Sequence, residues 1–148
     1  MNFYIVVQII TSTIAATSVM TLFSYAVSAS ARELYKEPVL LGYILKVFGI
    51  EVKLPVRITL GWILHYLIGL TFVIAYHFLW TYKIFEMSWS TALLFGAISG
   101  IIGIISWIIM FASAPKKPDI NLPGYYTQLF VAHVIFAIVA FVVYKLFL

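Results

Sequence analysis

The chain has 148 residues, of which 64% are hydrophobic and only 9% are charged, and its formal net charge is +4. An ordinary soluble domain carries about 25% charged residues, so this composition indicates an integral membrane protein. Each membrane span takes roughly 20 apolar residues, which leaves room for four or five helices and excludes a separate soluble domain. The absence of cysteine excludes disulfides, thiolate nucleophiles and iron–sulfur clusters. The positive excess is interpreted as a topology signal, and we expect no nucleic-acid partner.

The charged residues separate four charge-free stretches, because a charge at the bilayer centre costs about 2.5 kcal/mol or more. We predict transmembrane helices at about 3–31, 57–82, 88–113 and 124–147. The stretches are continuously apolar and lack the alternation of lipid-facing strands. The sequence therefore predicts an all-α integral membrane protein, a four-transmembrane-helix bundle forming a single domain over residues 1–148, with the lipid bilayer as its surroundings.

The first predicted helix carries a stripe of hydroxyl side chains at helical spacing. Small polar residues on one face of a helix favour hydrogen bonding to a neighbouring helix in lipid. A narrow polar pathway is the alternative. The stripe consists of Thr13, Thr17, Thr21, Ser24 and Ser28.

The first loop contains a segment at about 38–49 whose apolar residues recur at helical spacing between Pro38 and Gly49. One interpretation is a short amphipathic helix that lies in the membrane interface. The other is a connector whose apolar side chains pack under the bundle.

The second predicted helix carries Gly61, His65, Gly69 and Tyr76 on one face. Small residues let the backbones of two helices approach closely in lipid. His77 lies roughly 120° around the helix from His65, near the predicted helix end, and we interpret it as an interface anchor.

The third predicted helix has a seam of small residues formed by Gly96, Gly100 and Gly103. Such a seam either closes the bundle or forms a homodimer.

The fourth predicted helix repeats the second with a shift of 68 residues, so that His133 and Tyr144 match His65 and Tyr76. This internal repeat predicts two helical hairpins in the same orientation, related by an axis along the membrane normal. The two histidines would then lie at the same depth.

The histidine pair has three interpretations, and we expect Thr17, Thr21 and Ser24 to flank it together with Tyr76 and Tyr144. A neutral histidine can serve as a packing group that hydrogen-bonds a neighbouring helix. A pair that titrates near neutral pH can handle protons or a small solute, or serve a pH-linked stress role. A pair of imidazoles is also the ligand set of a b-type haem or another metal.

Catalytic motifs are lacking in the sequence. All five acidic residues lie outside the predicted spans, which disfavours chemistry that needs a carboxylate at depth. There is no metalloprotease motif, nucleophile elbow or phosphate-binding loop. We therefore expect a protein that is not an enzyme and needs no cofactor, with a scaffold or accessory subunit of a membrane complex as a further alternative.

Four segments together resemble the small YagU-like bacterial inner-membrane proteins: TSVMTLFSY, GWILHYLIGLTFVIAYHFL, GAISGIIGIISWIIMF and FVAHVIFAIVAFVVYKL. The resemblance implies a four-helix protein of the bacterial inner membrane and no particular activity. Loops one and three hold seven of the nine Lys and Arg residues, so we expect these loops in the cytoplasm and both termini outside.

Overall fold

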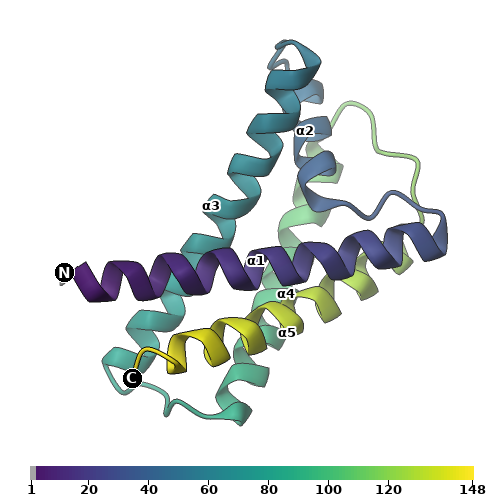
Figure 1. The fold of residues 1–148 in the computed structure, drawn as a ribbon. Helices are drawn as coiled ribbons and strands as arrows, with labels where there is room; N and C mark the ends of the chain where they lie inside the picture. Colours follow the sequence, from purple (N-terminus) through teal and green to yellow (C-terminus); the bar gives the residue numbers. More distant parts are fainter. Residues whose placement is uncertain (1–2) are drawn as a thin grey trace.

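The computed structural model describes residues 3–148, and within them the chain forms five helices and no strand (Figure 1). Four of the helices are long and apolar enough to cross a membrane, namely α1 (Phe3–Ala31), α3 (Leu54–Thr81), α4 (Trp89–Ser113) and α5 (Leu122–Lys145). The fifth, α2 (Glu37–Val47), is short. The predicted all-α fold with four candidate spans is confirmed, and the chain is a polytopic membrane protein in contact with lipid.

α3 and α5 begin earlier in the chain than the sequence predicts, because a proline in the first turn of each helix favours the start of the helix. Pro55 lies in the first turn of α3, where a missing N–H costs no hydrogen bond. α5 also has a proline in its first turn and begins at Leu122. The Asn121 side chain accepts a hydrogen bond from the backbone N–H of Gly124 at 3.2 Å and so caps this helix.

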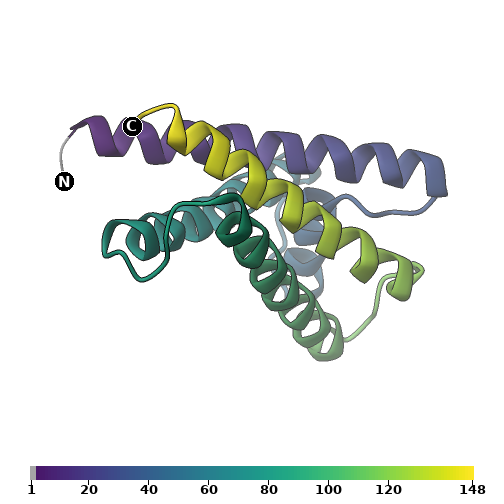
Figure 2. The ribbon, with the colours of Figure 1, turned by 90° about the horizontal axis from the view of Figure 1, so that it is seen from below.

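α1 and α5 run antiparallel beside each other, so both termini lie at one end of the pair (Figure 1). The Tyr4 hydroxyl donates a hydrogen bond to the carbonyl of Phe147 at 2.6 Å and joins the two ends. α4 packs along α5, as the view from below shows (Figure 2), whereas α3 crosses α1 steeply. The loops at 32–36 and 114–121 lie together at the opposite end from the termini.

α2 is a helix, and it packs onto the protein by one face, as the second interpretation of its segment expects, while the opposite face is exposed. Its buried face contacts α3, where the carbonyl of Pro38 lies directly against Gly61. Val39 and Lys46 are exposed on the opposite face. The residues buried by this packing are Glu37, Pro38, Leu40, Leu41, Gly42 and Ile44.

The glycine seam of α4 is covered by α5. A Cβ atom on Gly96 would lie 2.7 Å from the Cα of Val134, and one on Gly103 would lie 2.8 Å from the His133 ring. Gly100 meets the same helix between these two points. The seam therefore closes the α4–α5 pair and is not a surface for a second copy of the chain.

Candidate functional site

A cavity of about 260 Å³ lies between α1, α3, α4 and α5, with the first turn of α2 at one side. Its walls are mostly apolar, as is typical of sites for small molecules, which add a few polar groups for orientation. The titratable and hydroxyl side chains that line it are Thr17, Glu37, His65, Ser106 and His133.

His65 is buried on α3 and presents its Nε2 to the Oγ1 of Thr21 at 2.8 Å. The Thr21 hydroxyl donates its own hydrogen to the carbonyl of Thr17 at 2.6 Å. A hydroxyl has one hydrogen, so Thr21 accepts from the Nε2–H of His65. The hydrogen-bond network thus assigns the tautomer and leaves the His65 Nδ1 as a proton acceptor.

His133 is buried on α5, where its Nδ1–H donates to the carbonyl of Leu129 at 2.8 Å. A carbonyl only accepts, so the Nε2 of the neutral ring carries the lone pair. The Nε2 atom would lie 3.0 Å from a Cβ on Gly103, which also lines the cavity. A side chain at this position would crowd the imidazole, so glycine leaves room for the His133 ring.

Glu37 is 2% exposed and lines the same cavity. Its Oε1 accepts hydrogen bonds from the Oγ of Ser24 at 2.8 Å and from the Nε2 of Gln128 at 3.2 Å. Its Oε2 is buried and has no hydrogen-bond partner among residues 3–148. Burial raises the pKa of Glu37 to about 7, although the hydrogen bonds from Ser24 and Gln128 oppose the shift.

The expectation that the acidic residues leave no carboxylate at depth is therefore wrong for Glu37, which is buried and lines the cavity with both histidines. α2 folds back onto the other helices, so a residue that lies in a loop of the sequence reaches the interior. The signal that could have found Glu37 is Gln128 in the fourth span, because a polar side chain inside a span needs a hydrogen-bonding partner.

The hydroxyl stripe of α1 faces the protein interior along its whole length. Thr21 and Ser24 make the two hydrogen bonds described above. Thr17 lines the cavity directly beside Gly69, and its Oγ1 is buried without a hydrogen-bond partner in the described part of the chain. Of the predicted flanking residues, Thr21 contacts His65 and Thr17 lines the cavity with both histidines, whereas Ser24 contacts Glu37.

Tyr76 and Tyr144 do not line the cavity, although the repeat groups them with the histidines. The Tyr76 hydroxyl pairs with Ser99 of α4. The Tyr144 hydroxyl lies 2.6 Å from the Nδ1 of His77, which is 8% exposed. The interpretation of His77 as an interface anchor is wrong, and the repeated tyrosines make unlike contacts.

The cavity does not fit a bis-histidine haem. Its volume of about 260 Å³ lies below the roughly 300 Å³ at which pockets for drug-sized ligands begin. The Nε2 of His65 is engaged by Thr21, and the Nε2 of His133 lies against Gly103. Within residues 3–148, no group of three or more His, Asp or Glu residues is placed to hold a metal ion.

No protein-family model, curated protein or solved structure matches this chain. The likeness to the YagU-like proteins remains a prediction from the sequence. The case for a function therefore rests on the residues of the cavity and their geometry.

Proposed function

We propose that this chain is a non-enzymatic membrane protein that takes up and releases protons in the cavity lined by Glu37, His65 and His133. The observation that carries the proposal is that all three side chains line one cavity and each keeps an atom free to accept a proton. Proton uptake there would serve the handling of a small solute or a response to pH.

Neutral pH is the range in which the Glu37 carboxyl changes charge, because burial raises its pKa to about 7. Among the described residues no Lys or Arg lines the cavity, so the ionised Glu37 carboxyl has no fixed positive charge beside it. Uptake of a proton at neutral pH removes this buried charge.

Ile68 of α3 and Ser106 of α4 both line the cavity and are both exposed. We propose that a solute enters the cavity from the membrane between these two helices. The walls are mostly apolar, which suits a small, weakly polar molecule better than an ion.

We further propose that the four long helices form a bundle in the bacterial inner membrane, with both termini outside. The two basic loops lie at one end of the molecule, where the Tyr43 hydroxyl donates to the carbonyl of Lys116 at 2.6 Å. The helices of each predicted hairpin, α1 with α3 and α4 with α5, contact each other, although α3 crosses α1 steeply and α4 packs along α5 (Figure 1). The sequence likeness to the YagU-like proteins agrees with this arrangement.

The test is proton flux into liposomes that contain the purified protein and a trapped pH-sensitive dye. After an external pH jump, the parent should equilibrate faster than protein-free liposomes. Glu37→Gln and the double variant His65→Phe, His133→Phe should each lower the rate toward the protein-free value, because they remove the free acceptors.

His77→Phe is the matched control, because His77 is a buried histidine outside the cavity. Each variant must elute as a single species and keep its helical circular dichroism. A parent rate equal to that of protein-free liposomes would contradict the proposal. So would a loss of flux in His77→Phe as large as that in the double variant.

A further inference from the structure

A second hollow, of about 430 Å³, lies outside the cavity, between α2, the first half of α3 and the loop that connects α4 to α5. Three basic side chains line it, Lys46 of α2, Arg57 of α3 and Lys116 of the loop. No Asp or Glu of the described residues is part of its lining. We call this hollow the basic groove.

The rest of the basic groove is apolar and opens to the outside. Val39, Leu54 and Ile58 line it and are exposed. Trp62 lines the basic groove and also lines a second groove, of about 360 Å³, which runs between α1 and α3 and is almost wholly apolar. An apolar track therefore leads from the three positive charges along the side of α3.

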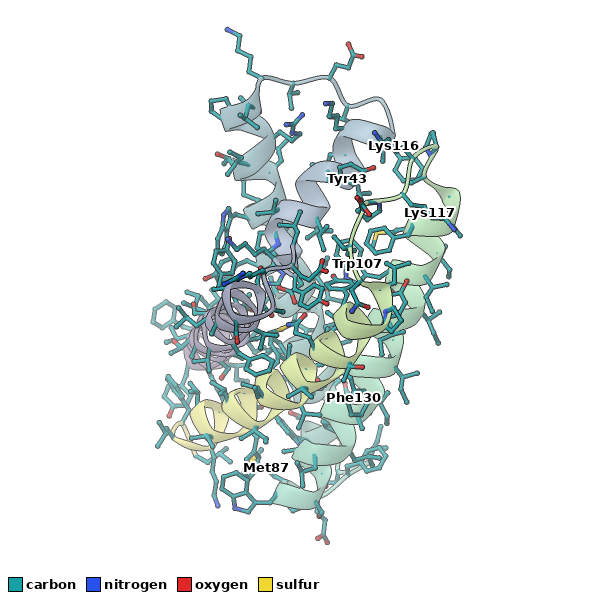
Figure 3. The ribbon with its side chains drawn as sticks, turned by 90° about the vertical axis from the view of Figure 1, so that its right-hand side faces the viewer. Tyr43, Met87, Trp107, Lys116, Lys117 and Phe130 are labelled. Atoms are coloured by element: carbon teal, nitrogen blue, oxygen red, sulfur yellow. The ribbon has the colours of Figure 1, made fainter. Side chains whose placement is uncertain are left out.

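The packing of α2 creates this shape. Gly61 lies directly against the carbonyl of Pro38, and Gly42 faces the backbone of Arg57, so the two helices meet in close backbone contact. The hydrogen bond from the Tyr43 hydroxyl to the Lys116 carbonyl holds the loop beside α2. Figure 3 shows Lys116 next to Tyr43 at this end of the molecule, with Met87 at the other.

We propose that the basic groove binds one anionic phospholipid, with its phosphate between Lys46, Arg57 and Lys116 and an acyl chain against Trp62. Uncompensated positive charge beside exposed apolar surface complements a lipid of this class. The positive-inside rule places this end of the molecule at the cytoplasmic leaflet, where membranes carry anionic lipid. The site shares no residue with the cavity, so it stands apart from the proposed proton function.

Native mass spectrometry of the detergent-solubilised protein tests the proposal with dioleoyl phosphatidylglycerol and dioleoyl phosphatidylcholine as probes. We expect the parent to retain one phosphatidylglycerol molecule several-fold more often than one phosphatidylcholine. Replacing a single basic residue by Gln should lower the preference about fivefold. The triple variant Lys46→Gln, Arg57→Gln, Lys116→Gln should retain the two lipids equally.

The matched control is Lys53→Gln, Lys83→Gln, Lys117→Gln, which removes the same charge from residues that do not line the basic groove. It should keep the preference. If the triple groove variant does not fold, Lys116→Gln alone serves, because Lys116 lies exposed in a loop.

A variant that fills the apolar part of the groove, Val39→Trp, should lower binding of phosphatidylglycerol while every positive charge remains. Equal retention of the two lipids by the parent would overturn the proposal, and so would an equal loss in the control. Displacement of the lipid by inorganic phosphate would also overturn it, because the groove would then be a site for soluble phosphate.

Discussion

Replacing Glu37 by Gln should make the protein more stable above neutral pH, an unusual effect for the loss of a hydrogen-bonded carboxyl. The Gln amide oxygen can still accept from Ser24 and Gln128, as Oε1 does now. The Gln amide nitrogen takes the place of Oε2, which has no hydrogen-bond partner within residues 3–148. Gln thus imitates the protonated carboxyl and cannot ionise.

The magnitude follows from the pKa of Glu37, which burial raises from 4.5 to about 7 in the folded protein. The folded state binds this proton more tightly than the unfolded chain. The stabilisation is therefore complete below pH 4.5 and is lost as the pH rises to about 7. The shift corresponds to about 3 kcal/mol of unfolding free energy. The Glu37→Gln variant cannot lose this stabilisation. Its unfolding free energy should therefore exceed that of the parent by up to the same amount at pH 8 and differ little at pH 4.5.

The assay is chemical unfolding in detergent micelles, followed by tryptophan fluorescence at several pH values from 4.5 to 8. Glu51→Gln is the control, because Glu51 is an exposed carboxyl in the same loop region and its loss should leave the pH slope unchanged. The prediction is wrong if the unfolding free energy of Glu37→Gln falls with rising pH as steeply as that of the parent. In that case another group controls the pH dependence of stability.

Three further predictions concern packing and ligand binding. Gly69→Ala places a methyl group against the Oγ1 of Thr17 and should cost about 1–3 kcal/mol of unfolding free energy. Adding Thr17→Ala should restore at least half of that free energy. If the double variant recovers none of it, the strain does not arise from contact with Thr17. Tyr144→Phe removes the hydrogen bond to His77 and should lower the unfolding free energy by about 1 kcal/mol. A double-mutant cycle with His77→Phe that shows no coupling energy would mean that this hydrogen bond does not stabilise the protein. Protein purified from haem-replete cells should show no reduction-sensitive visible bands, whereas such bands, lost in His133→Ala, would reinstate the haem interpretation.

The membrane class, the four spans and the polar faces of the helices all follow from local patterns in the chain. A span is a local property, because the cost of placing charge in hydrocarbon can be read from about 20 successive residues. The inward direction of the hydroxyl stripe follows from the helical period in the same way, so the sequence predicts that Thr17, Thr21 and Ser24 share one buried face without naming their partners.

The groups that meet in the cavity are set by long-range packing. Glu37 belongs to a loop in the sequence, and it reaches His65 and His133 because α2 folds back against Gly61. Which hydroxyl meets which ring depends on how each helix is rotated and where two helices cross, and neither is encoded in a local pattern. His77 shows the same limit, since its partner Tyr144 lies 67 residues away along the chain and only packing joins them.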